Sequence, residues 1–158
     1  MDAMNQRAKI RPFVPDDLED MMRIWRDATV VVHDFMTEAD LDREEEMIRG
    51  GMIDQTESWL ACRDSEIEGF ISLMGRLIVA LFVAPEFHRM GLGTRLIAHV
   101  NDLHGPMNVE VFKENVTGVA FYRKNGFEFV REEPNPFYDR PQIIMAQPGA
   151  PEASRPAD

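Results

Sequence analysis

With 158 residues, of which 44% are apolar and 28% charged, the chain has the length and composition of a single soluble domain. Its 28 acidic and 17 basic residues give a net charge of −11, which argues against a nucleic-acid partner and suits either a cationic amine substrate or solubility alone. No apolar run approaches the ~20 residues of a membrane helix, no signal peptide is visible, and the single cysteine, Cys62, suits a reducing compartment, so we expect a cytoplasmic protein without membrane contact.

The N-terminal third predicts one strand and two helices. Residues 9–14 have the pattern of a short strand. Apolar side chains then recur at helical spacing from Leu18 to Trp25, which predicts a helix over residues 16–27. A highly charged second helix is expected over residues 38–49.

The middle of the chain predicts three strands joined by short turns, over residues 58–63, 67–74 and 77–83. Such short connections make neighbouring strands antiparallel. The third strand is apolar along its whole length, so we expect it to be buried on both faces.

The C-terminal half alternates helices and strands and ends in a polar tail. The tail, residues 148–158, is poor in bulky apolar side chains and is expected to be disordered. The alternation as a whole predicts a single domain of the α/β (α+β) class. The expected elements are a helix over 94–104, a strand over 107–112, a helix over 116–124 and strands over 127–131 and 142–146.

A glycine loop carries the first chemical signal. Gly91-Leu92-Gly93 lies shortly after Pro85, the end of the apolar strand, and immediately before a helix. The free amides and the dipole of a helix N-terminus make an anion site suited to pyrophosphate. By itself the pattern equally fits a tight turn that packs a helix on a sheet. A P-loop motif is absent, and the three glycines of a dinucleotide-binding turn are not present after the first strand.

Two motifs in register resemble a known superfamily. Val83-Ala-Pro85 followed by His88-Arg-Met-Gly-Leu-Gly93 resembles the acetyl-CoA signature of the GNAT N-acetyltransferases. Asn115-Val-Thr-Gly-Val-Ala-Phe-Tyr-Arg-Lys-Asn-Gly-Phe127 resembles a second motif of the same superfamily. The resemblance implies a GNAT fold over residues 8–147, with a mixed central sheet of about seven strands flanked by about four helices.

The N-terminal part is similar to one subgroup of that superfamily. Ile24-Trp25 and Val32-His33-Asp34-Phe35-Met36 are similar to the corresponding segments of the small bacterial YjaB-like proteins. The chain departs from the usual superfamily pattern at His88, Met90 and Gly118. Because most contacts in the glycine loop come from the backbone, we expect slightly looser binding of coenzyme A (CoA) rather than its loss.

The resemblance implies direct transfer of the acetyl group of acetyl-CoA to an amine in a ternary complex. Amides near Phe82 and Val83 are expected to bind the pantetheine arm and polarise the thioester carbonyl. Tyr122 occupies the position of the general acid that protonates the departing thiolate. Asn115 is either a pantetheine ligand or only a helix N-cap. The remaining donor-site residues are those whose amides are expected on the pyrophosphate: His88, Arg89, Met90, Gly91, Leu92, Gly93 and Thr94.

On the acceptor side, two residues are candidates for the base. His33 lies between the first two helices, a segment that leans over the acceptor in this fold, and a neutral imidazole suits the task. Asp34 beside it would orient the ring or bind a cationic amine. Glu110 is the other candidate, acting directly or through water. The alternatives are a structural or capping role for His33 and a solvent-facing position for Glu110.

The expected partner is therefore a small-molecule or peptide amine. No set of His, Cys, Asp and Glu has zinc-ligand spacing, so no metal is expected. A homodimer is a candidate assembly, because the closing strands of this fold often pair between subunits. The alternative functions are a CoA-binding module of the same fold without catalysis, and an unrelated α/β domain with a structural glycine loop.

Overall fold

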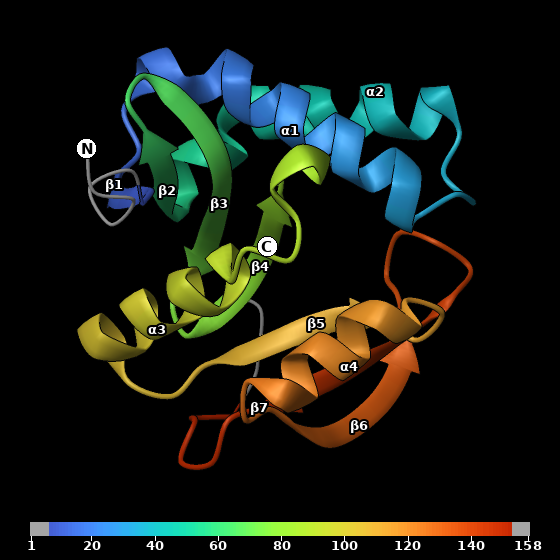
Figure 1. Ribbon diagram of the computed structural model, residues 1–158. Coiled ribbons are helices and arrows are strands. Elements are labelled where there is room, and N and C mark those ends of the chain that lie inside the picture. Colours follow the sequence, from blue (N-terminus) through green and yellow to red (C-terminus); the bar gives the residue numbers. More distant parts are fainter. Residues whose placement is uncertain (1–6, 153–158) are drawn as a thin grey trace.

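The computed structural model describes residues 7–152, and over that range the chain forms one seven-stranded sheet in the order β1-β2-β3-β4-β5-β7-β6 (Figure 1). Neighbouring strands are antiparallel except β4 and β5, which are parallel. The expected mixed sheet with about four helices is thus confirmed. The strands are β1 (Lys9–Pro12), β2 (Glu57–Arg63), β3 (Glu66–Met74), β4 (Leu77–Val83), β5 (Asn108–Phe112), β6 (Glu128–Pro134) and β7 (Pro141–Ala146), and the α-helices are α1 (Leu18–Val32), α2 (Glu38–Met47), α3 (Leu92–His104) and α4 (Val116–Lys124).

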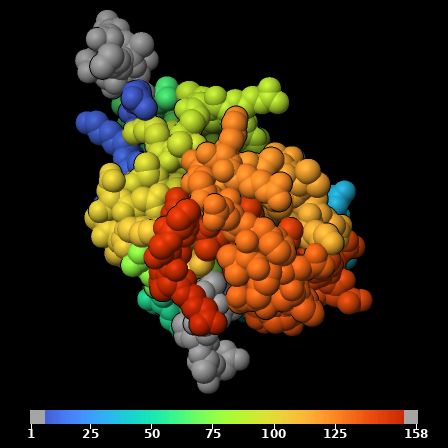
Figure 2. Space-filling view, turned by 90° about the horizontal axis from the view of Figure 1, so that it is seen from below, coloured from blue at the N-terminus to red at the C-terminus, as the bar shows by residue number. Residues whose placement is uncertain are grey.

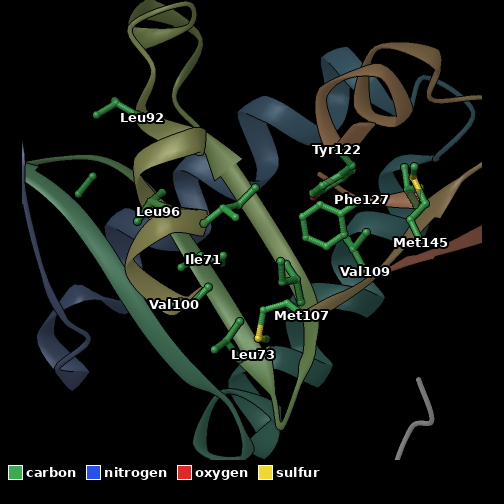
Figure 3. Close-up of a cluster of buried hydrophobic side chains, with 14 of the residues drawn as sticks. Ile71, Leu73, Leu92, Leu96, Val100, Met107, Val109, Tyr122, Phe127 and Met145 are labelled. Carbon is green, nitrogen blue, oxygen red and sulfur yellow. The ribbon is translucent and has the colours of Figure 1, made fainter. Parts of the chain in front are cut away.

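Two apolar cores hold the helices to the sheet. In one, Met21 of α1 and Leu41 of α2 pack with Phe70 of β3, and α1 and α2 lie together at the top of Figure 1. In the other, Leu96 of α3 and Tyr122 of α4 pack with side chains of the sheet (Figure 3). Burying apolar area on both sides of the sheet is what fixes the helices in place.

α1 is longer than the sequence pattern predicts. The helix continues from Asp27 to Val32, because Ala28 and Thr29 extend its buried stripe at the right spacing. Val31 is 67% exposed, so the β-branched run that weakens the local helix signal faces outward. Within residues 7–152 no helix is long and apolar enough to cross a membrane.

The apolar strand β4 was expected to be buried on both faces, and this holds fully only at its start. Leu77 and Ile78 are buried, but the residues from Val79 to Val83 are only partly buried, although side chains from both faces of this stretch pack against the two cores. The reason lies in the pairing. Within the described residues, β4 pairs with β5 only at Leu77 and Ile78, and the two strands then separate. On the other edge of β4, the register with β3 shifts and leaves Val79 as an extra, bulged residue.

The start of the expected C-terminal tail is packed. The Gln147 side chain hydrogen-bonds to Asn101 of α3 and to the Asn125 carbonyl after α4, at 2.7 and 3.2 Å. The Asn108 amide also donates to the Pro151 carbonyl at 2.8 Å. In Figure 2 the red C-terminal stretch accordingly lies between the yellow α3 and the orange α4–β6 region. Pro151 of that segment thus contacts the domain, residues 153–158 lie outside the described residues, and the disorder of the tail stays a prediction.

Candidate active site

The opening between β4 and β5 leads directly into the glycine loop. The chain leaves β4 at Val83 and enters α3 after a short 3-10 turn over Pro85–Phe87. The Ala84 amide donates to the Glu68 carbonyl of β3 at 2.9 Å, and the Phe87 amide donates to the Ala84 carbonyl at 2.8 Å. These bonds hold the loop at the carboxyl end of β4, where the strands have parted.

The N-terminus of α3 presents unpaired amides to this opening. Gly91 is the N-cap in the left-handed conformation, with φ of 77°, and Arg89 has φ of 67°. The first hydrogen bond of the helix runs from the Arg95 amide to the Gly91 carbonyl, at 3.1 Å. The amides of residues 92–94 lie before that bond and therefore have no partner inside the helix. Together with the helix dipole they form an anion site.

Two departures from the superfamily pattern have local reasons. The His88 ring turns back, and its Nε2 lies 2.8 Å from the Val83 carbonyl oxygen, at the end of β4. Asn115 caps α4, since its side chain accepts a hydrogen bond from the Gly118 amide at 2.9 Å. A β-carbon at position 118 would lie 2.4 Å from the Asn115 side-chain nitrogen. A larger residue at 118 would therefore displace the Asn115 side chain from this capping position.

Tyr122 lies at the other side of the opening, on α4. It is 9% exposed, and its ring packs edge-on against Phe121 and Phe127 with centroids 5.3 Å away in each case. Burial raises the pKa of Tyr122 above its ordinary value, so the hydroxyl stays protonated at neutral pH. In Figure 3 the hydroxyl oxygen lies at the end of the ring nearer β4.

His33 follows the end of α1 and meets the end of β5. Its amide donates to the Thr29 carbonyl at 2.7 Å, which closes the last turn of the helix. The ring packs against Phe112 at 4.9 Å and Phe35 at 5.8 Å between centroids. Burial lowers the pKa of His33, so the imidazole is neutral at neutral pH.

Asp34 and Glu110, the two acidic candidates of the acceptor side, lie in different environments. Asp34 is exposed, and within residues 7–152 its side chain has no hydrogen bond or ion pair. Asp34 therefore does not form the contact with His33 that would orient the imidazole ring. Glu110 is half-buried on β5, and the Gln142 side chain of β7 donates to it at 3.3 Å. Its role, as a base or as a strand residue that faces solvent, stays a prediction.

Sequence reasoning missed Glu44 and Tyr138. The Tyr138 hydroxyl donates to the Glu44 carboxylate at 2.7 Å, and the Tyr138 ring lies 6.0 Å from that of Phe112. Nothing in the sequence of α2 indicates which of its many carboxylates points inward. Within the described residues, no group of three His, Cys, Asp or Glu side chains could hold a metal ion.

Comparison with known proteins matches this geometry to one family. Residues 54–129 match the acetyltransferase (GNAT) domain family. The chain is 30% identical over 123 residues to the peptidyl-lysine N-acetyltransferase YiaC of Escherichia coli, covering 77% of this chain and 84% of that protein. It is 32% identical to the peptidyl-lysine N-acetyltransferase YjaB of Salmonella typhimurium, covering 70% of this chain and 76% of that protein.

Among solved structures, the apo form of YjaB from Escherichia coli has the same fold. The superposition has a TM-score of 0.79 and covers 90% of this chain and 99% of that one, at 24% sequence identity. The similarity to the YjaB-like subgroup, seen first in the segments around Trp25 and His33, is confirmed by these matches.

Proposed function

Because the chain belongs to the GNAT acetyltransferase family, we propose that it transfers the acetyl group of acetyl-CoA to the side-chain amine of a lysine in a peptide or protein. Membership makes the chain an acetyl-CoA-dependent N-acetyltransferase. The lysine acceptor is supported by the names of two relatives, YiaC and YjaB, which are both peptidyl-lysine N-acetyltransferases.

The main support for the proposal is the N-terminus of α3, which follows the end of β4 that no longer pairs with β5. The amides from Arg89 to Thr94 would bind the pyrophosphate of acetyl-CoA, with those of residues 92–94 unpaired inside the helix. The His88 amide, also expected there, donates to the Pro85 carbonyl at 3.3 Å. Phe82 and Val83 lie on the part of β4 that no longer pairs with β5 but still pairs with β3. Because successive amides of a strand point to opposite edges, one of these two amides would face the pantetheine arm or the thioester carbonyl. Asn115 would reach the pantetheine in addition to capping α4.

The chemistry follows from these positions. The neutral amine nitrogen attacks the thioester carbonyl carbon, a C–N bond forms and the C–S bond breaks. The proton lost by the amine passes to His33, whose pKa is lowered by burial, or through water to Glu110. Tyr122, which like any tyrosine of ordinary or raised pKa is protonated at neutral pH, gives its proton to the departing thiolate and regains one from solvent after release. Asp34, exposed beside His33, would attract the cationic acceptor.

Two further parts of the proposal concern the protein in the cell. We place it in the cytoplasm, in agreement with a lone cysteine, Cys62. A homodimer is supported by β6, which is an edge strand of the sheet and carries Phe129, 55% exposed, and Val130, 48% exposed.

The test is acetylation of a panel of lysine peptides whose α-amine is blocked. We expect release of free CoA that depends on peptide, with the acetyl group located on the lysine side chain by mass spectrometry. Matched peptides with norleucine in place of lysine are the control, because they keep the aliphatic chain and lack the amine. Acetylation confined to free α-amines or to small polyamines would overturn the lysine acceptor, and CoA binding without turnover on any amine would indicate a binding module.

A further inference from the structure

Four rings from three separate segments meet at the acceptor side, and the ring of His33, the proposed base, is one of them. His33 and Phe35 follow α1, Phe112 ends β5, and Tyr138 lies in the loop between β6 and β7. Phe35 is 5.1 Å from Phe112 and 6.1 Å from Tyr138 between centroids, in edge-to-face contacts. We call these four residues the aromatic cluster. It joins parts of the chain that are about a hundred residues apart, at the acceptor side of the site.

The loop that carries Tyr138 is held in one shape by its own side chains. Asn135 accepts hydrogen bonds from the amides of Phe137 and Tyr138 at 2.8 and 3.1 Å. Its own side-chain amide donates to Gln142 of β7 at 2.9 Å. Tyr138 is therefore presented by a preorganised turn, and ligand binding there does not have to order the loop first.

A cation already lies on this cluster. The guanidinium carbon of Arg140 is 4.2 Å from the centroid of the Phe35 ring, which is cation–π geometry. The same guanidinium pairs with Glu114, at 2.6 and 2.7 Å to its two oxygens. The rings thus offer faces that accept positive charge, and the carboxylate that neutralises Arg140 is Glu114 and not Glu44.

In the part of the chain that the structure describes, Glu44 forms no ion pair, unlike four of the other acidic residues of α2. Arg26 pairs with Glu38, Asp42 and Glu45, at 2.9, 2.7 and 3.1 Å. Arg43 pairs with Asp40 at 2.7 Å. Within residues 7–152, Glu44 forms no ion pair, and its carboxylate is half-buried under the Tyr138 hydroxyl. Glu44 is therefore a carboxylate beside aromatic rings that can bind a cation, and among the described residues no cationic side chain is in direct contact with it.

We propose that Glu44 and the aromatic cluster form a subsite for a second, basic side chain of the acceptor, next to the lysine that is acetylated. This inference rests on the proposed peptide acceptor. The reacting amine must be neutral to attack, and a carboxylate in contact with it would favour its protonated form. A cation bound by Glu44 is therefore a second side chain of the same peptide, an arginine or lysine next to the lysine that is acetylated.

The electrostatics of Glu44 agree with that role. Desolvation raises the pKa of the Glu44 carboxyl, and the Tyr138 hydrogen bond and the charge of Arg43 offset this only in part. A half-buried carboxylate whose ionised form is disfavoured gains most from a cation that arrives with the ligand. The net charge of −11 further favours basic peptides during encounter.

The test compares Glu44→Gln with wild type on two sets of peptides bound to the CoA-loaded protein. In both sets norleucine replaces the target lysine, so binding is measured without turnover. One set carries arginine at successive flanking positions, and the other carries glutamine there. For wild type we expect arginine at one or two flanking positions to lower the Kd about fivefold or more. Glu44→Gln, which keeps an oxygen for the Tyr138 hydroxyl, should remove this preference and leave the glutamine peptides unchanged.

Glu46→Gln is the matched control, because Glu46 is exposed on the same helix and its loss changes the net charge equally. If Glu46→Gln lowers the preference as much as Glu44→Gln does, general charge attraction explains it and the subsite is refuted. Equal Kd values for arginine and glutamine peptides in wild type would also refute it. Tyr138→Phe serves as a second variant, expected to weaken the preference without abolishing it. Loss of the proposed lysine activity would appear separately, as absent turnover on lysine peptides.

Discussion

At the scale of single residues, Tyr122 has the two properties required of a general acid for a thiolate. Its hydroxyl is protonated at neutral pH, since burial raises its pKa. Its ring is also held by Phe121 and Phe127, which limits the positions the hydroxyl can take. A buried tyrosine could instead serve packing alone, and substitution distinguishes the two roles.

We expect Tyr122→Phe to lower kcat tenfold or more, equivalent to ~1.4 kcal/mol of barrier, with little change in the Kd for CoA. Phenylalanine fills the same space, so the melting temperature should stay close to that of wild type. Steady-state kinetics with a lysine peptide, with CoA titration alongside, measure both quantities. An unchanged kcat would show that Tyr122 is only a packing residue.

At the scale of elements, the first turn of α3 depends on two glycines for different reasons. Gly91 adopts a positive φ of 77°, which ends the loop and starts the helix. Gly93 has an ordinary helical conformation, but a β-carbon there would lie 2.8 Å from the Phe121 ring of α4. The second glycine of the motif therefore lets α3 and α4 approach each other. The sequence pattern alone left two interpretations open, an anion site and a tight turn that packs the helix on the sheet.

Gly93→Ala should lower the melting temperature, although alanine favours a helix over glycine by ~1 kcal/mol. Crowding against Phe121 is expected to cost about 1–3 kcal/mol and to outweigh that gain. In a Phe121→Leu background the crowding is relieved, and the same substitution should become neutral or stabilising. Urea unfolding of the four proteins gives the coupling energy, expected at about 1 kcal/mol. A Gly93→Ala effect of equal size in both backgrounds would contradict the contact.

At the scale of the whole molecule, one carboxyl is buried without a hydrogen bond. Glu68 is 0% exposed, and it is the extra residue where the β2–β3 register shifts. Arg63 Nε lies 3.2 Å from its Oε2, but neither carboxyl oxygen has a hydrogen-bond partner among the described residues. Desolvation raises the pKa of Glu68, and Arg63 offsets this only in part.

The pH dependence of stability follows from that shift. Because the folded-state pKa of Glu68 is raised, its native form holds its proton more tightly than the unfolded chain does. Glu68 therefore adds to the free energy of unfolding below pH 4.5, the ordinary pKa of the carboxyl. This contribution is lost as the pH rises through the folded-state pKa. We expect Glu68→Gln to be more stable than wild type at pH 7, by a margin that shrinks toward pH 5. Urea unfolding over pH 5–8 measures it, with the exposed Glu66→Gln as control, and a pH-independent margin would refute the assignment.

The fold was largely predictable because its signals are local. Strand and helix patterns, the glycines before α3 and the cap residue of α4 each depend on a few adjacent residues. They predicted the order of elements, which the structure confirmed, and the resemblance they carry indicated the family, which the family match confirmed. The roles of the individual site residues remain predictions.

What the sequence determined by itself is therefore the fold and the donor, acetyl-CoA. Only the tertiary structure decided the exposure of β4, which depends on where β5 stops pairing with it at Ile78. It alone brought Glu44 to Tyr138, across 94 residues, and His33 to Phe112. Such contacts are set by how the elements pack and not by the pattern along any one of them, because distant segments meet only once the cores have formed.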